Sequence, residues 1–288
     1  MTDMRLRSII ADMTHTFLLF PDFKLKAVTL SYDDGTVTDK HLAEIADAYG
    51  LKCTFNICSE LLAREEGGRM LTETAAFKLY AESGHEVAVH GAQHMSLPEL
   101  SDGLATRELI RDKENLERLF ERIVYGMAYA NGKYDDRTVE TVRRCGLRFA
   151  RTVKATLSFD LPDDFLKWNP TCHHDEPRLD ELVEEFLPDA YDDYFFANKP
   201  KLFYLWGHSV EFERNKNWHV LENFAKKVGN RDDIFYATNG EICTYVEAYR
   251  ALRTSADGKI IHNPTCTDVF LNYFGKKVCI SAGQTVRM

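Results

Sequence analysis

The alternation of two kinds of segment along the chain constrains its fold most strongly. Short runs rich in β-branched and aromatic residues alternate with segments of helical periodicity, without an internal repeat or a Gly/Ser linker. Strands are predicted at 26–32, 53–57, 86–89, 124–129, 149–153, 202–206 and 234–238. Helices are predicted between them, at 39–49, 73–83, 106–120, 136–145, 179–186, 218–228 and 241–251.

This order of elements predicts an α/β fold with a parallel sheet. Strands that are apolar throughout are buried on both faces, and helices supply the crossovers between them. About seven such units favour a distorted or incomplete (β/α) barrel over an open sheet. After residue 258 the pattern changes to short strands around a Gly-Lys-Lys turn. We therefore expect a barrel domain over residues 1–258 and a small C-terminal antiparallel β appendage over 259–288, packed on the barrel.

The composition excludes several classes of partner. The 288 residues carry a net charge of −9 without a basic stripe, so neither nucleic acid nor an anionic membrane surface is expected to bind. The apolar run at 17–20 is too short for a spanning helix or a secretory signal. The seven cysteines are dispersed without a CxxC pair, which is typical of reduced, mostly buried thiols. We expect a cytoplasmic protein, and the sequence leaves its oligomeric state open.

Two adjacent carboxylates follow the first predicted strand. Asp33 and Asp34 leave a buried apolar run just before a glycine. Their desolvation and mutual repulsion are costly unless a cation compensates for them. A turn that caps the next helix is the ordinary alternative for an Asp-Gly sequence.

Histidines follow two other predicted strands. His90 and His94 are four residues apart, a spacing that lets two imidazoles face the same way and bind a divalent ion, although a solvated or core pair has the same spacing. A metallopeptidase is disfavoured because Gly91 replaces the glutamate that would follow the first histidine. His208 is either a general acid or a structural histidine bonded to a loop carbonyl.

The three groups are expected to meet, because the carboxyl ends of parallel barrel strands lie at one rim. Asp34, His90 and His94 would then bind a divalent ion, with Asp33 as a nearby base and His208 as a nearby acid. Such an ion lowers the pKa of bound water and polarises a carbonyl. The arrangement predicts hydrolysis of an amide or ester.

These residues resemble the polysaccharide deacetylase family, carbohydrate esterase family 4, over roughly residues 26–249. The sequence Ser-Tyr-Asp-Asp-Gly at 31–35 is similar to the family's first motif, Thr/Ser-Phe-Asp-Asp-Gly. The resemblance implies a barrel fold, with Asp33 as catalytic base and Asp34 as metal ligand. His90 and His94 match the metal ligands of the second motif, His-Ser/Thr-x-x-His, although a glycine replaces the hydroxyl residue. His208 matches the catalytic acid of the last motif.

Two motifs depart from the family. Where the third motif usually reads Arg-x-Pro-Tyr-Gly, this chain has Ala-Tyr-Ala-Asn-Gly at 128–132, so the arginine that orients the base is absent from that motif. Asn131 would still offer a backbone N–H to the oxyanion, beside Tyr129. The candidate fourth motif keeps Trp168 but has no evident aspartate to pair with the arginine. The group that orients Asp33 therefore stays open.

The remaining candidates concern the substrate wall. Trp168 and Trp206 could stack on a sugar ring, although aromatic residues near strand ends are more often core. His173 and His174 could line the pocket, supply another metal contact or lie in an exposed loop.

The resemblance implies a metal-dependent hydrolase of carbon–nitrogen (non-peptide) bonds, removing an N-acetyl (or O-acetyl) group from an acetylated amino sugar or oligosaccharide. The implied cofactor is a divalent metal ion, zinc first, with cobalt, nickel or manganese as alternatives. The altered motifs leave open a non-sugar amide or cyclic imide as substrate, because pocket walls determine the substrate while ligands determine the chemistry. A non-catalytic carbohydrate-binding protein is the third alternative.

Overall fold

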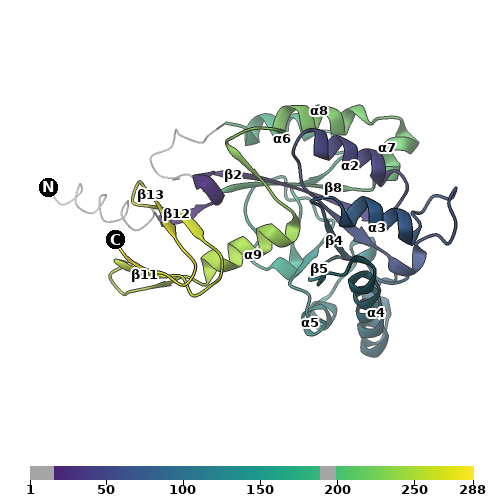
Figure 1. Cartoon of the computed structure of the whole chain (residues 1–288), viewed down its shortest axis with the longest axis horizontal. Coiled ribbons are helices and arrows are strands. Elements are labelled where there is room, and N and C mark those ends of the chain that lie inside the picture. The colour runs from purple at the N-terminus through teal and green to yellow at the C-terminus, as the bar shows by residue number, and fades with distance from the viewer. Residues whose placement is uncertain (1–15, 189–198) are drawn as a thin grey trace.

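A curled parallel sheet covered by helices forms most of the computed structural model, which describes residues 16–188 and 199–288 (Figure 1). The strands of the main sheet follow the order β6-β5-β4-β3-β2-β8-β7, every neighbouring pair is parallel, and β9 pairs with the first residues of β2. Their bounds are β2 Lys26–Asp34, β3 Cys53–Ile57, β4 Glu86–Val89, β5 Gly126–Ala128, β6 Phe149–Arg151, β7 Cys172–His173, β8 Lys201–Gly207 and β9 Ile234–Tyr236.

The two edges of the sheet are linked by the chain between β6 and β7. Trp168 N donates to Ala150 O (3.0 Å), and Thr152 N donates to Trp168 O (2.9 Å), so this residue flanks β6. Four residues later the chain enters β7, which pairs with β8. No β6–β7 ladder is present within the described ranges. The expected incomplete barrel is confirmed, and β7 is a strand that the sequence did not predict.

Helices follow most of the strands and cover the sheet from both sides (Figure 1). The helices are α2 Asp39–Ala48, α3 Glu73–Ala81, α4 Asp102–Phe120, α5 Asp136–Arg144, α6 Leu179–Phe186, α7 Ser209–Asn215, α8 His219–Val228 and α9 Asn239–Arg250. Short 3₁₀ turns lie at Pro21–Phe23, Ser59–Leu61, Leu97–Glu99, Ala130–Gly132 and Phe165–Lys167. Each predicted helix is present, whereas α7 was missed because seven residues are too few for a periodic pattern.

Small antiparallel sheets lie at one end of the molecule, beside α9 (Figure 1). They consist of β1 Thr16–Leu19 with β12 Val269–Tyr273 and β13 Lys276–Ile280, and of β10 Arg253–Thr254 with β11 Ile260–His262 and β14 Thr285–Arg287. The Tyr245 hydroxyl of α9 donates to Leu19 O and accepts from Phe270 N, which ties the first sheet to the barrel. The expected antiparallel strands are confirmed. The domain division after residue 258 stays a prediction.

The catalytic candidates Asp33 and Asp34 lie at the end of a buried strand. Every residue of β2 from Lys26 to Asp33 is buried, and Asp34 is the first to reach partial exposure. Five of the seven cysteines are buried, as predicted, namely Cys53, Cys58, Cys145, Cys172 and Cys243. Within the described residues, none of the helices has the length and apolar character needed to cross a membrane.

A buried carboxyl at the start of α2 makes stability depend on pH. Asp39 accepts hydrogen bonds from Tyr80 Oη (2.6 Å) and from Ser209 Oγ, and burial raises the pKa of Asp39 to about 7. Because this pKa exceeds that of an unfolded aspartate, its contribution to stability is complete at low pH and is lost as pH rises through 7. We expect the free energy of unfolding to fall by roughly 3–4 kcal/mol through this group between pH 4 and 8. Urea denaturation across that range measures it. Asp39→Asn should flatten the profile, and an unchanged slope would contradict this assignment.

Candidate active site

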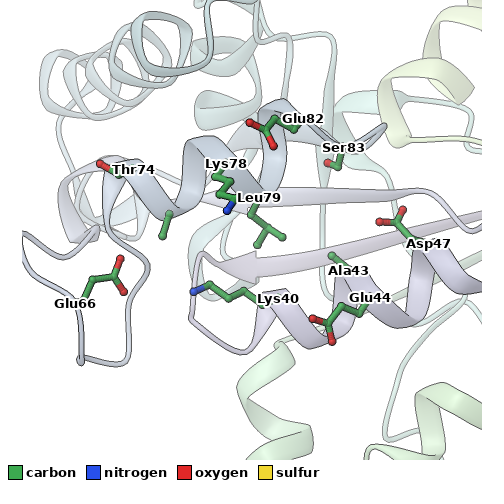
Figure 2. Close-up of a pocket in the computed structure, with 11 residues that line it drawn as sticks. Lys40, Ala43, Glu44, Asp47, Glu66, Thr74, Lys78, Leu79, Glu82 and Ser83 are labelled. Atoms are coloured by element: carbon green, nitrogen blue, oxygen red, sulfur yellow. The ribbon is translucent and has the colours of Figure 1, made fainter.

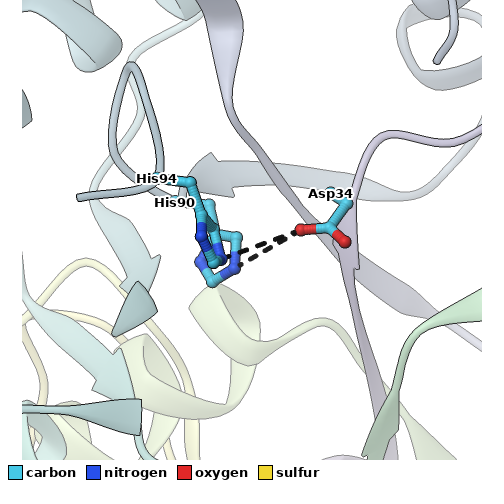
Figure 3. A group of neighbouring side chains, drawn as sticks. All are labelled: Asp34, His90 and His94. Carbon is cyan, nitrogen blue, oxygen red and sulfur yellow. Dashed lines mark ion pairs between the residues drawn. The ribbon is translucent and has the colours of Figure 1, made fainter. Parts of the chain in front are cut away.

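Side chains after β2 and β4 converge at the carboxyl end of the sheet. The strand registers place Asp34 beside Ile57 of β3, and Ile57 beside Val89 of β4, so the next residue, His90, lies at the same rim. Asp34 Oδ1 lies 3.8 Å from His90 Nε2 and 3.9 Å from His94 Nε2. Figure 3 shows both imidazoles presenting a nitrogen to the same carboxylate oxygen. These predicted ligands are therefore brought together.

The orientation of His90 leaves its Nε2 free to bind a metal ion. His90 Nδ1 lies 2.9 Å from Ala128 O, and because a carbonyl oxygen only accepts, Nδ1 carries the proton. The lone pair of Nε2 then faces Asp34, the arrangement usual for a metal-binding histidine. Burial lowers the pKa of His90, which favours the neutral ring. Two imidazole nitrogens and a carboxylate oxygen are a donor set that suits zinc and its neighbours among divalent metals.

The loop that carries His94 is held by Glu108 of α4. Glu108 Oε1 accepts from Gln93 N (2.7 Å) and from Met95 N (3.3 Å). Gly91 has a φ of +84°, and a Cβ there would lie 3.0 Å from Glu108 Oε1. The positive φ favours glycine, and a Cβ there would also crowd the Glu108 carboxylate. Glu108 thus supports the loop where the hydroxyl residue of the second motif is missing.

Asp33 is buried among side chains that donate hydrogen bonds to it or can carry a positive charge. Its Oδ1 accepts from Asn56 Nδ2 (2.8 Å), and its Oδ2 forms an ion pair with Arg151. His90 Nε2 and His208 Nε2 lie 3.7 and 3.8 Å from Oδ2. Burial alone would raise the pKa of Asp33, but the Arg151 charge, with the two histidines, lowers the pKa below its ordinary value. Asp33 is therefore ionised at neutral pH and held in one orientation.

Arg151 is the group that orients Asp33, which the third motif left unidentified. It ends β6, its side chain is 0% exposed, and its guanidinium carbon lies 4.2 Å from the centre of the Trp206 ring. The arginine absent from the loop after β5 is supplied instead by the neighbouring strand. A signal was present in the sequence: an arginine at the end of the apolar run Phe-Ala-Arg requires a buried anionic partner.

His208 lies on the other side of Asp33, with Glu211 behind it. His208 Nδ1 is 3.5 Å from Glu211 Oε2, and His173 Nε2 is 3.1 Å from the same oxygen. Burial lowers the pKa of His208, but Glu211 and the aspartates outweigh it and raise the pKa above its ordinary value. Glu211 was not predicted, because its helix was not. His173 is 20% exposed and His174 only 1%, so the exposed-loop alternative for this pair is wrong.

Other predicted substrate contacts are divided between interior and surface. Trp168 is buried against the rings of Phe165 and Tyr204, which fits the core alternative. Tyr129 is also buried, and its hydroxyl donates to a backbone carbonyl of residue 166 (2.9 Å). In this structure neither ring is available to stack on a sugar. Asn131 is exposed in the loop after β5, with a φ of +57°.

A groove of about 580 Å³ lies between α2 and α3, apart from these residues (Figure 2). Lys40 and Lys78 extend into the space between the two helices, among carboxylates (Figure 2). It is lined by Lys40, Ala43, Glu44, Asp47, Glu66, Thr74, Ala75, Lys78, Leu79, Glu82 and Ser83. None of the predicted site residues contributes to this groove.

Comparison with known proteins finds the same family that the site residues resemble. Residues 21–150 match the family model named polysaccharide deacetylase. The fold is similar to that of a Mycobacterium smegmatis protein assigned as a polysaccharide deacetylase, with 17% identity and a TM-score of 0.59 over 81% of this chain and 94% of that one. It is also similar to a family 4 acetyl xylan esterase from Clostridium thermocellum in complex with a cobalt ion, with 14% identity and a TM-score of 0.52 over 76% and 90% of the two chains.

A more partial similarity links this chain to the Streptococcus pyogenes deacetylase PplD, solved in complex with acetate, at 20% identity and a TM-score of 0.44. The alignment covers 48% of this chain, which spans only 61% of the length of PplD. No curated protein sequence matches the chain. The sequence match over residues 21–150 and the shared fold confirm that this chain resembles the polysaccharide deacetylase family.

Proposed function

We propose that this protein is a metal-dependent deacetylase that hydrolyses an N-acetyl, or O-acetyl, group on a carbohydrate. One observation carries the proposal: the Asp34, His90 and His94 donors lie directly beside a buried, ionised Asp33 that is flanked by His208. The family match and the fold support a carbohydrate deacetylase. An acetylated amino sugar or oligosaccharide is the proposed substrate, and a cytoplasmic location stays a prediction.

The proposed cofactor is zinc, with cobalt, nickel or manganese as alternatives that the same donors accept. His90 and His94 would supply nitrogen ligands, and Asp34 would supply an oxygen ligand. A divalent ion bound there lowers the pKa of water and polarises the acyl carbonyl.

The chain's own residues then move the protons. Asp33 Oδ2 accepts a proton from the attacking water, while Arg151 and Asn56 hold the carboxylate in position. The backbone N–H of Asn131 is the proposed donor to the oxyanion. His208 Nε2 gives a proton to the leaving nitrogen or oxygen as the acyl bond breaks, which releases acetate and a free amine or alcohol. The raised pKa of His208 supports this role, because it favours the protonated ring.

The substrate proposal is tested by a panel of acetylated compounds. The zinc-loaded protein should release acetate from N-acetylglucosamine oligomers or acetylated xylose oligomers. Release of a carboxylate from a small amide or cyclic imide, without acetate from any sugar, would favour the alternative substrate class. Sugar binding without hydrolysis in the presence of zinc, cobalt, nickel and manganese would contradict an enzyme.

Replacing His94 with alanine is expected to remove one bound metal ion per chain and to abolish acetate release. His94 supplies one of three ligands, and the remaining pair cannot hold the ion at micromolar concentration. Elemental analysis after gel filtration counts the metal. His41→Ala is the matched control, because His41 is a half-exposed histidine of α2 remote from the site. Full metal content in His94→Ala would contradict the ligand assignment.

A further inference from the structure

The side chains of His173, His208 and Glu211 converge on a second point, and His174 lies beside them. Glu211 Oε2 lies 3.1 Å from His173 Nε2, 3.4 Å from His174 Nε2 and 3.5 Å from His208 Nδ1. The topology explains why these side chains lie close together. β7 pairs with β8 at His173, and α7 begins directly after β8, so Glu211 on its first turn faces the end of β7.

The ligand atoms of His173, His208 and Glu211 lie close enough to share one metal ion, because all of them are within 4.8 Å of one another. Zinc binds nitrogen and oxygen at about 2.0–2.2 Å in a tetrahedral arrangement, which separates neighbouring ligand atoms by about 3.4 Å. The three distances from Glu211 Oε2 fall at 3.1–3.5 Å. The corresponding distances in the Asp34 set are 3.8 and 3.9 Å. Two imidazole nitrogens and one carboxylate oxygen are also a donor set that zinc binds.

Unsatisfied buried atoms point to a ligand at this position. Glu211 Oε2, His208 Nδ1 and both ring nitrogens of His174 are buried without a hydrogen-bond partner. The side chain of His174 is almost wholly buried, and its Nε2 lies 3.4 Å from Glu211 Oε2. Each buried polar atom that lacks a partner lowers the stability of the folded protein. A cation at the centre of the group would satisfy Glu211 Oε2 and His208 Nδ1.

Surrounding contacts fix the rings in this arrangement. His173 Nδ1 is hydrogen-bonded to the Asp175 carboxylate, which leaves Nε2 for a metal, as in the carboxylate–histidine pairs of known metal sites. His174 stacks on Phe212, with ring centres 4.0 Å apart. A Cβ at Gly207 would overlap His174 Nδ1, so glycine is needed there to admit the imidazole.

We infer that His173, His208 and Glu211 form a second divalent-cation site, adjacent to the Asp34 site and separate from it, with His174 packed beside it. This second site would exist whether or not the protein is a deacetylase. Its effect on activity rests on the proposed function. A cation on Nδ1 of His208 replaces the proton there, so the ring keeps one N–H and cannot release it without becoming an anion. The second cation should therefore inhibit acyl hydrolysis, while the first supports it.

Counting zinc in matched variants tests the second site. The wild-type protein, equilibrated with zinc and passed through gel filtration, should retain two ions per chain. His94→Ala and Glu211→Gln should each retain one, and the double variant should retain none. Glu211→Gln keeps the size of the side chain, and circular dichroism checks that it folds. A Glu211→Gln protein that retains as much zinc as the wild type would overturn the inference, as would a wild type whose single ion is lost in His94→Ala.

A zinc titration of activity separates this inference from the proposed function. Acetate release should rise with the first equivalent of zinc and fall with the second. In Glu211→Gln the activity is compared between one and two equivalents of zinc, because the variant also alters His208, and the second equivalent should cause no further fall. Two zinc ions per chain with no hydrolysis of any substrate would retain the second site and reject the deacetylase. A falling phase of equal size in Glu211→Gln would reject the inhibitory role.

Discussion

Arg151→Met is expected to lower kcat/KM for deacetylation by about 10²–10⁴-fold, the usual contribution of a general base. Without Arg151, the effect of burial is offset only by the two histidines, so the pKa of Asp33 rises and its carboxylate is a less available proton acceptor. The same change should lower the free energy of unfolding by about 3–5 kcal/mol, because it breaks a buried ion pair. Steady-state kinetics across pH and urea denaturation measure the two effects.

Two further variants distinguish charge from packing. Arg151→Lys keeps the positive charge but not the planar group that lies over Trp206, so it should recover only part of the activity. Asp33→Asn combined with Arg151→Met removes both buried charges and should be more stable than Arg151→Met alone. If the acidic limb of the pH profile stays in place in Arg151→Met, then Arg151 does not hold the pKa of Asp33.

The sequence predicted the elements that have a strong repeating pattern. The β3 and β4 strands and the α6 helix were predicted at their observed bounds, because apolar runs and helical periodicity are local properties. From the strand order alone, Asp34, His90 and His94 could be expected at one rim, and their nitrogen and oxygen atoms do meet there. The catalytic proposal therefore depended on local patterns and one rule of topology.

The sequence could not predict contacts that depend on which strands become neighbours. Arg151 reaches Asp33 across the barrel interior, 118 residues away along the chain. Glu211 lies on a seven-residue helix, and His173 on a two-residue strand, both too short to leave a periodic signal. The N-terminal β1 pairs with β12 near the other end of the chain. Each of these contacts is set by tertiary packing and not by local preference.

The relocation of the arginine has a consequence for the substrate wall. In the family, the third motif supplies an arginine from the loop after the strand that corresponds to β5, whereas here that loop carries the exposed Asn131. Arg151 is instead wholly buried beneath Trp206, so the charge that orients the base is shielded from solvent. The loop around Asn131 therefore carries no arginine, and its Lys133 is paired with Glu99.

Asp33→Asn is expected to reduce kcat by about 10²–10⁴-fold while the metal content stays that of the wild type. The amide has nearly the shape of the carboxylate and can still accept from Asn56 or Arg151, but it cannot take a proton from water. The neighbouring carboxylate provides the matched control: Asp34→Asn should lose both the activity and one bound metal ion, because Asp34 is a proposed ligand. Elemental analysis and acetate release measure the two properties in parallel.

The pair of adjacent variants discriminates between two roles that a single activity assay would confuse. Both aspartates lie at the end of β2, but Asp33 faces Arg151 and His208 inside the barrel, whereas Asp34 faces His90 and His94 at its rim. If Asp33→Asn loses metal as readily as Asp34→Asn, then Asp33 is a ligand and another group must act as the base. If it keeps the metal and full turnover, the proton from the attacking water must go elsewhere, and no other carboxylate among the described residues lies within ion-pair distance of both His90 and His208.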